Sequence, residues 1–139
     1  MLDYARQRAI EALCIPRKAV LATSGPAGLQ IGEFRCEAAG LELYLLVPNT
    51  SDHLFNMDHD ATVILWTAAW ELKGKAQVIS LNGLDVELEL LREPGIKWCT
   101  LVRVEPCRMQ IRRQGSWGNL ETIDIGSHFP GSISPDAKS

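Results

Sequence analysis

The sequence lacks any long hydrophobic run. Its longest uninterrupted apolar stretches, such as residues 43–48, have only the length of a β-strand, whereas a membrane-spanning helix needs about 20 apolar residues. The N-terminus also lacks a basic patch followed by an apolar stretch, which is the pattern of a secretory signal. We therefore expect no membrane association and a cytoplasmic location.

Cysteine and positive charge are also scarce. The chain has four cysteines without a C-x-x-C pair, and three histidines. No zinc-finger spacing can be assembled from them, and we expect free thiols that are mostly buried. Lysine and arginine total 14 against 17 aspartate and glutamate residues, for a net charge of -3. A mildly acidic chain without a basic block disfavours nucleic-acid binding.

What the chain does have is an ordinary globular composition. Its 139 residues are 46% hydrophobic and 22% charged, which suits one soluble domain with an adequate core. Glycine, serine and proline become frequent from Gly115 onward. We therefore expect a single domain over residues 1–125 and a flexible tail over residues 126–139.

Hydrophobic periodicity predicts a mainly β fold with short helices. An amphipathic helix is expected at 2–13, a second one runs through Met57 after the capping residues 50–52, and a third is expected at 84–90. Strand-like runs separated by turn residues account for most of the remaining chain. They are 19–23, 29–37, 41–47, 61–67, 70–79, 98–105 and 107–113, with a bend at Pro106 between the last two. Six or seven such strands indicate a small antiparallel barrel.

Two of these strands carry more apolar surface than the interior of a small barrel can cover. Strand 41–47 is apolar at nearly every position, which is typical of a strand buried on both faces or lying in a barrel wall. Strand 61–67 is similarly rich in apolar residues. Uncovered, these strands would form patches larger than soluble monomers normally tolerate, so we expect a homodimer.

A glycine interrupts the most regular strand. Strand 70–79 alternates between apolar and polar residues and carries Gly74 at an apolar position. A glycine inside a strand indicates a β-bulge or the close approach of another surface. Both a ligand ring and a second subunit are candidates for that surface.

Four segments follow one another in a recognisable order between residues 17 and 113. They are 17–23 (RKAVLAT), 43–51 (LYLLVPNTS), 61–66 (ATVILW) and 72–76 (LKGKA). In order and spacing they resemble the FMN-binding split barrels related to pyridoxamine 5′-phosphate oxidase. The resemblance implies a split β-barrel, a homodimer with FMN sites in the subunit interface, and redox chemistry at the flavin.

The resemblance makes residues 49–51 the loop that binds the cofactor phosphate. Asn49, Thr50 and Ser51 immediately precede a predicted helix, so hydroxyls and free backbone N–H groups gather at its N-terminus, as a phosphate requires. A plain helix cap is the alternative interpretation. The family loop continues with a polar residue and then lysine, whereas this chain has Asp52 and His53. A negative charge and a mostly neutral imidazole thus stand near the phosphate position.

Further residues are placed around the flavin by the resemblance. Arg17 matches the basic residue of the first strand and would partly compensate for the missing lysine. Ala22 and Thr23 would lie along the ring system, and Trp117 follows the last predicted strand, from where the family often reaches the partner's site. Ordinary packing or a surface position is the alternative for each.

The other potentially reactive side chains form no predicted site. His53 and His59 are six residues apart and lie on different sides of a helix, so no shared metal is expected. Cys99 and Cys107 lie on successive predicted strands and could approach each other.

Three functions are therefore left open. The first is an FMN-dependent oxidoreductase acting on a small molecule that the sequence does not identify, and the second is a flavin carrier or sensor. The third is an FMN-free or haem-binding dimeric barrel, with His53 or His128 as the candidate axial ligand. The strand order and the hydroxyls of residues 50–51 favour the first two, whereas Asp52 and His53 favour the third. No residue is identified as catalytic.

Overall fold

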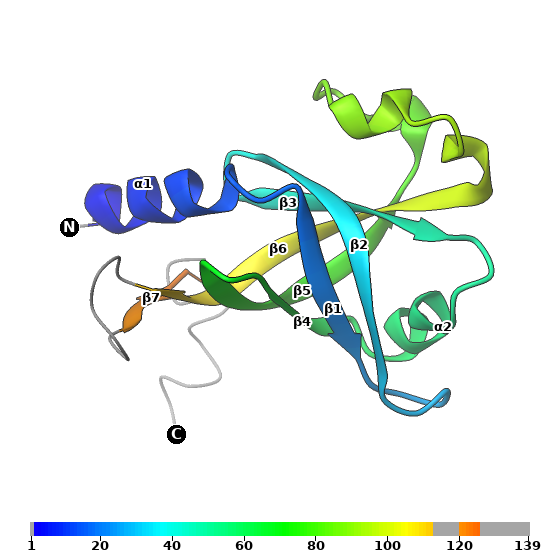
Figure 1. The fold of residues 1–139 in the computed structure, drawn as a ribbon, viewed down its shortest axis with the longest axis horizontal. Helices are drawn as coiled ribbons and strands as arrows, with labels where there is room; N and C mark the ends of the chain where they lie inside the picture. Colours follow the sequence, from blue (N-terminus) through cyan, green and yellow to red (C-terminus); the bar gives the residue numbers. More distant parts are fainter. Residues whose placement is uncertain (1, 113–119, 126–139) are drawn as a thin grey trace.

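The structure is a computed structural model that describes residues 2–112 and 120–125. Within these residues the chain forms one antiparallel sheet of seven strands in the order β3-β2-β1-β4-β5-β6-β7. β3 also pairs with β6, which closes six strands into a barrel that β7 extends (Figure 1). The predicted antiparallel barrel of six or seven strands is confirmed. The strands are β1 Lys18–Thr23, β2 Gln30–Ala39, β3 Glu42–Pro48, β4 Thr62–Trp66, β5 Trp70–Ile79, β6 Cys99–Arg112 and β7 Leu120–Asp124.

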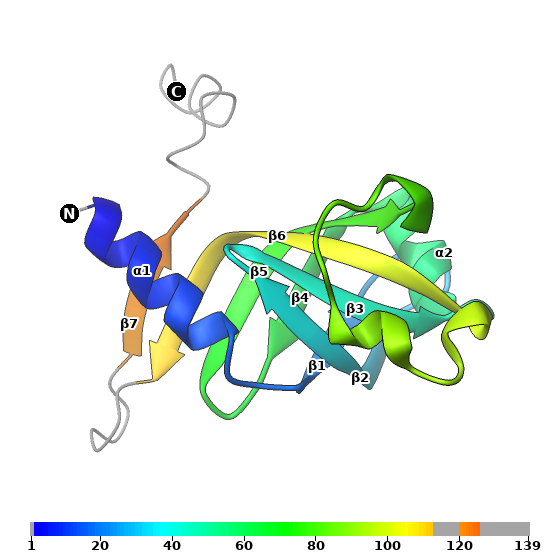
Figure 2. The same ribbon diagram turned by 90° about the horizontal axis from the view of Figure 1, so that it is seen from above.

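Two α-helices accompany the barrel, close to their predicted positions. α1 (Leu2–Leu13) lies beside β7 (Figure 2), where Arg8 forms a 2.8 Å ion pair with Glu121. The indole of Trp70 donates a hydrogen bond of 2.9 Å to the carbonyl oxygen of Ala12, which ties α1 to the barrel core. α2 (Asp52–His59) follows β3 after a short turn. Among the described residues, no helix is long and apolar enough to cross a membrane.

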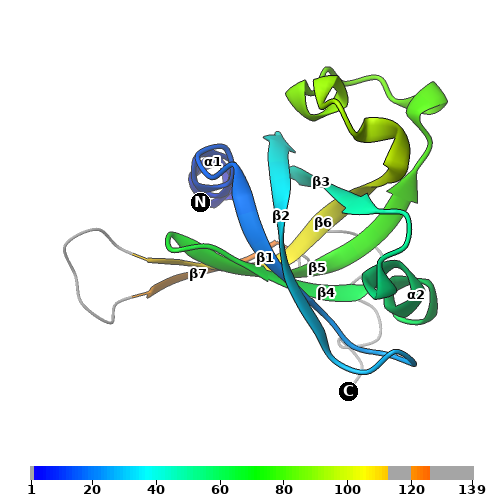
Figure 3. The ribbon, with the colours of Figure 1, turned by 45° about the vertical axis from the view of Figure 1, so that its right-hand side comes forward.

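β3 is buried on both faces, as predicted, but its outer face is covered by the same chain. One face adds Leu43, Leu45 and Val47 to the barrel core. The other face forms a second apolar cluster, whose buried members are Tyr44, Leu46, Leu88, Leu90 and Leu101. The segment after β5 crosses over β3 to complete this cluster (Figure 3). The apolar surface of β3 therefore gives no argument for a second subunit.

The same segment is not the helix predicted at 84–90. Its regular elements are short 3-10 turns, η1 Leu81–Gly83, η2 Glu89–Arg92 and η3 Ile96–Trp98, and the backbone is extended at Leu84 and Leu88. Apolar residues at every second position face the cluster beside β3, namely Leu84, Val86, Leu88 and Leu90. A helix would spread a row with this spacing around its circumference. Burial of the row therefore overrides the helix propensity of leucine and glutamate.

β6 is one strand where the sequence predicts two. It continues through Pro106, and the irregularity is absorbed by a β-bulge. Lys73 pairs with Arg108 whereas Gly74 pairs with Pro106, so Cys107 has no partner opposite it. Proline lacks an N–H group and is tolerated in strands mainly at edges and bulges. The bulge predicted at Gly74 is thus confirmed, and it keeps β6 continuous.

The four cysteines are free thiols, as predicted. Cys99 and Cys107 lie on the same strand, about 26 Å apart along β6. The prediction that they lie on successive strands is therefore wrong, and the approach that this position left open does not occur. The expectation of mostly buried thiols is wrong as well, because only Cys36 is buried.

β7 lies in a region for which the sequence predicts no strand. It pairs with the end of β6, and Ile123 and Ile125 contribute buried side chains to the core. The signal for this strand is the local isoleucine alternation, which the surrounding glycine and serine residues obscure. The tail predicted over residues 126–139 lies outside the described residues.

Gly74 is expected not to tolerate even alanine. A Cβ atom at this position would lie 2.6 Å from the carbonyl oxygen of Glu105 and 2.8 Å from Cγ1 of Val104. We expect Gly74→Ala to lower the free energy of unfolding, measured by urea denaturation, by about 1–3 kcal/mol. Gly95→Ala is the matched control, because a Cβ there meets no atom within 4 Å. Equal stability of the two variants would contradict this role of Gly74.

Candidate functional site

The residues predicted to bind the cofactor phosphate form the turn between β3 and α2. The backbone N–H of Asn49 donates to the carbonyl oxygen of Trp98 at 2.9 Å, and its side-chain oxygen accepts from the Thr100 hydroxyl at 2.6 Å. These bonds hold the turn to the start of β6. Ser51 is the N-cap of α2, and its Oγ accepts the N–H of His53 at 3.1 Å. The alternative interpretation of Ser51 as a helix cap is confirmed.

A buried asparagine that the sequence analysis misses holds α2 against the barrel. The Asn56 side chain donates to the carbonyl oxygen of Gly28 at 2.8 Å and to Thr23 Oγ1 at 3.2 Å, and it accepts from the Ala27 N–H at 3.0 Å. These bonds join α2 to β1 and to the hairpin turn at 24–28. They determine which side of α2 faces away from the barrel. A weak sequence signal existed, because residues 53 and 56 are both polar and share one helix face.

His53 points toward the barrel wall. Its side chain is only 5% exposed, Nδ1 lies 2.8 Å from Thr23 Oγ1, and the ring meets Phe34 edge-on with 5.2 Å between centroids. Because the Thr23 hydroxyl accepts from Asn56, it can donate its own proton to His53, which favours a neutral imidazole protonated on Nε2. Burial lowers the pKa of His53, and the charge of Asp52 opposes this only in part. In this conformation the imidazole of His53 is bonded to Thr23 and is not placed like the side chain of a phosphate-binding lysine, while the position of Thr23 along a flavin ring stays a prediction.

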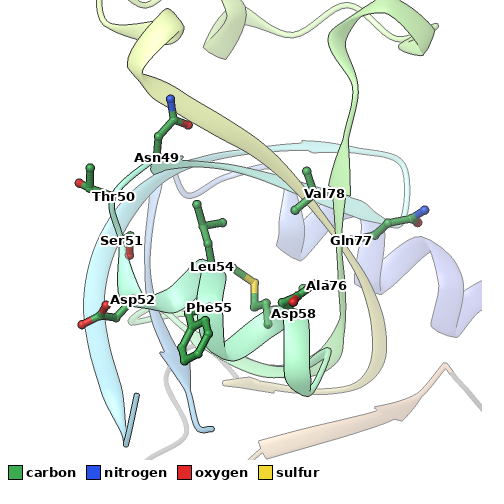
Figure 4. A pocket seen from close by; sticks show the side chains of 11 residues that line it. Asn49, Thr50, Ser51, Asp52, Leu54, Phe55, Asp58, Ala76, Gln77 and Val78 are labelled. Atoms are coloured by element: carbon green, nitrogen blue, oxygen red, sulfur yellow. The ribbon is translucent and has the colours of Figure 1, made fainter. Parts of the chain in front are cut away.

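A pocket of about 720 Å³ lies on the other side of α2, bounded by the turn, the helix and the end of β5 (Figure 4). Its rim carries three of the predicted residues, Asn49, Thr50 and Ser51. The apolar part of its wall comprises Leu54, Phe55, Met57, Ala76 and Val78, and Gln77 adds a polar side chain. Val78 is 60% exposed, so the predicted burial of alternate residues along β5 fails where the strand borders the pocket.

The pocket is acidic. Asp52 and Asp58 belong to its lining, and the described lining includes no lysine, arginine or histidine. A phosphate monoester in the pocket would meet carboxylates without a compensating cation. The residues present therefore do not fit the phosphate of FMN. The hydroxyls of the rim and the apolar wall do suit an uncharged ring that carries a polar chain.

Arg17 lies far from this pocket. It precedes β1, about 20 Å along the strand from Thr23. Its guanidinium is 3.5 Å from the Glu89 carboxylate, and Arg35 pairs with Glu93 at 3.0 Å. Both ion pairs connect the sheet to the η2 segment, although the Arg17–Glu89 pair is largely exposed to solvent. Within one chain, Arg17 does not compensate for the missing lysine.

Gly74 does not belong to the lining of the pocket. The surface that a Cβ at Gly74 would meet is β6, through Glu105 and Val104; the contact of Gly74 with a ligand or a second subunit stays a prediction. Trp117 lies outside the described residues. Among the residues that the structure describes, no group of three or more histidine, cysteine, aspartate or glutamate side chains could hold a metal ion.

An apolar strip crosses the outer face of three adjacent strands. Ala22 of β1 lies opposite Ile31 of β2 and Ile64 of β4, and opposed residues share one face of a sheet. Val20 and Trp66 lie in the next row of the same face, where Val20 is also opposite the exposed Glu33 of β2. Ile31 is 60% exposed and Ile64 39% exposed. We call these five residues the outer strip; they place Ala22 on an exposed surface.

Comparison with known proteins identifies the fold. Neither a protein-family model nor a curated protein matches the sequence. Among solved structures, General Stress Protein 26 from Bacillus anthracis is 15% identical, with a TM-score of 0.63 over 89% of this chain and 98% of its own. A Clostridium acetobutylicum protein related to general stress protein 26, described as belonging to the pyridoxinephosphate oxidase family, is 13% identical, with a TM-score of 0.62 over 88% and 94% of the two chains.

This chain has the split-barrel fold of pyridoxamine 5′-phosphate oxidase-like proteins. The same split barrel is similar to a haem-binding protein from Mycobacterium smegmatis, at 17% identity and a TM-score of 0.61. That match covers 86% of this chain and 57% of the other. At these identities the likeness extends to the fold alone, and the ligand depends on the residues of the site.

The buried histidine is expected to make the split barrel less stable in mild acid. Histidine in an unfolded chain takes up a proton near pH 6.5, whereas burial lowers the pKa of His53 in the folded state. Below pH 6.5 the unfolded state therefore binds more protons. The free energy of unfolding should then fall as the pH drops toward the folded-state pKa. Urea denaturation at neutral and at mildly acidic pH measures this.

His53→Asn should lose part of this pH dependence. His59→Asn is the matched control, because His59 is exposed on the same helix. An unchanged pH dependence in His53→Asn would show that the buried imidazole is not its source.

Proposed function

We propose that this protein is a homodimeric flavin-binding split barrel that holds the flavin in the pocket beside α2. The observation that carries the proposal is the position of this pocket. It opens at residues 49–51, in the segment that resembles the cofactor loop of FMN-binding split barrels. Its volume of about 720 Å³ falls within the range of small-molecule sites, which is about 300–1,000 Å³.

The lining of the pocket suits the two parts of a flavin. The isoalloxazine ring is flat and largely apolar, and Leu54 and Val78 extend into the space from α2 and β5 (Figure 4). The ribityl chain carries hydroxyl groups, and the rim of the pocket carries the polar residues Thr50 and Ser51. A bound flavin would supply electron chemistry while the protein positions it. Phe55 and Val78 of the lining are exposed, so a flavin held there would be open to a small reactant, and we favour oxidoreductase activity over a flavin carrier.

The homodimer is supported by the outer strip. Within the described residues, Ile31 and Ile64 leave apolar surface exposed in the middle of a sheet face, which soluble monomers keep small. A second copy of the chain would cover the strip by a symmetric contact. The uncovered apolar surface predicted on strand 61–67 thus still supports a homodimer, together with neighbouring residues of β1 and β2. Strand 41–47 no longer supports it, because its outer face is covered by the same chain.

Haem binding is the second candidate, supported by the similarity to the M. smegmatis haem-binding protein. The candidate axial ligand His53 is buried and bound to Thr23, so it would have to leave the barrel wall to reach an iron. The other candidate, His128, lies outside the described residues. The direction of His53 is the reason for ranking flavin above haem.

Flavin binding is tested by titrating purified protein with riboflavin or FMN and following the quenching of flavin fluorescence. We expect saturable quenching, which Val78→Phe should weaken by about tenfold, or about 1.4 kcal/mol, because the larger ring narrows the pocket. Leu81→Phe is the control, at an exposed site outside the pocket lining. Absence of saturable quenching with both flavins would overturn the proposal. A Soret band formed on adding haem would then favour the second candidate.

The dimer is tested by sedimentation velocity at micromolar concentration. The wild type should sediment with the mass of two chains, and Ile64→Lys should shift it toward one chain, because a charge in the centre of the outer strip cannot be buried without a partner. Ile15→Lys is the control, since Ile15 is 72% exposed but lies outside the outer strip. A wild-type mass of one chain would contradict the homodimer.

A further inference from the structure

We propose that the pocket beside α2 selects a flavin without a terminal phosphate, so that riboflavin binds more tightly than FMN. This inference rests on the flavin binding proposed above and names the chemical class of the ligand. It follows from the charges around the pocket, from the direction of the nearby cations and from the occupied N-terminus of α2.

The two charged residues of the pocket lining are both acidic. Asp58 comes from α2, and Asp52 stands at the rim with its carboxylate turned outward (Figure 4). Both residues are exposed. Among the described residues, neither carboxylate has an ion-pair partner within 4.0 Å. In the part of the chain that the structure describes, no cation therefore neutralises either carboxylate by an ion pair.

The cations nearest in the chain are engaged elsewhere. Lys75, which precedes Ala76 of the wall, donates from Nζ to Thr62 Oγ1 at 2.7 Å. Lys97, whose carbonyl oxygen contacts the Asn49 side chain, holds its Nζ over the Trp98 ring at 5.4 Å from the centroid. Neither lysine belongs to the pocket lining. The chain thus has lysines close to the site but does not direct them into it.

The N-terminus of α2 is already occupied by groups of the chain itself. Ser51 Oγ accepts the N–H of His53, which removes one donor that a phosphate would use. Asp52 lies in the first helical turn, where its negative charge already interacts with the positive end of the helix dipole. An incoming phosphate would compete with both. The free N–H groups and the positive helix end, which usually attract an anion, therefore already interact largely with groups of the chain itself.

The two flavins differ only in the group that would meet these residues. A phosphate monoester carries a charge of about −1.5 to −2 at pH 7, and carboxylates repel it most strongly where water is partly excluded. The terminal hydroxyl of riboflavin is neutral and can donate to a carboxylate such as Asp58. The same carboxylates that disfavour FMN would thus accept hydrogen bonds from riboflavin.

The experiment compares the dissociation constants of riboflavin and FMN for the full chain by fluorescence quenching at low salt. We expect riboflavin to bind at least about tenfold more tightly. Raising the salt concentration from about 0.1 M to about 1 M should reduce this ratio, because the Debye length shortens from about 10 Å to about 3 Å. The dissociation constant of lumichrome, which has a flavin-like ring but no ribityl chain, measures how much the ring alone contributes to binding.

Charge-neutralising variants assign the preference to named residues. Asp58→Asn should strengthen FMN binding several-fold and weaken riboflavin binding slightly, and Asp52→Asn should act in the same direction with a smaller effect because it stands at the rim. Asp85→Asn is the control, an exposed carboxylate outside the pocket lining. Lys97→Gln should leave FMN binding unchanged, because its ammonium group faces Trp98.

The outcomes separate this inference from the proposed function. If both flavins bind and FMN binds as tightly as riboflavin or more tightly, the selectivity is wrong while flavin binding stands. A loss of FMN binding in Lys97→Gln would likewise overturn the selectivity, since it would show that this lysine reaches the phosphate. If neither flavin binds, the proposed function itself fails.

Discussion

The pairing of β3 with β6 is the contact on which the rest of the structure depends, because it converts an open sheet into a barrel. It runs from Leu43 opposite Val104 to Pro48 opposite Cys99. Closure removes two open sheet edges and encloses one face of β3 in the core. It also turns the other face of β3 outward, where the segment before β6 must cover Tyr44 and Leu46. The turn after β3 consequently lies next to the start of β6, where the pocket opens.

Contacts on the opposite side of α2 determine which side chains of the helix line the pocket. Asn56 and Thr23 are buried, and burying polar groups is costly unless their hydrogen bonds are made. Asn56, Thr23 and His53 satisfy one another together with the hairpin turn, which fixes the rotation of the helix. That rotation places Leu54 and Asp58 toward the pocket. A polar network inside the barrel wall thus determines which side chains a ligand would meet outside it.

The split-barrel fold places the pocket but does not choose its ligand. Similar structures include a general stress protein and a haem-binding protein at identities of 15% and 17%. A fold can host different ligands because they contact a few side chains at the ends of its elements. Here those side chains include two carboxylates and, within the described lining, no cation. The ligand must therefore be argued from these residues rather than from the family.

The features that local sequence determined are those governed by neighbours in the chain. The apolar run of β3, the alternation at the start of β5, the cap at Ser51 and the bulge at Gly74 could be predicted because each reflects local backbone geometry. The turn at residues 49–51 was found for the same reason.

Tertiary structure decided whatever depends on a distant partner. Residues 84–90 are not helical, because their apolar side chains are buried against the outer face of β3. Pro106 remains within one strand, because Gly74 lies opposite it. The side chain of His53 points into the barrel wall, where it forms a hydrogen bond with Thr23. Arg17 lies away from the pocket, because the extended strand β1 separates it from the turn. Sequence spacing measures distance along the chain, whereas the pocket and its charge arise from residues that only the folded barrel brings together.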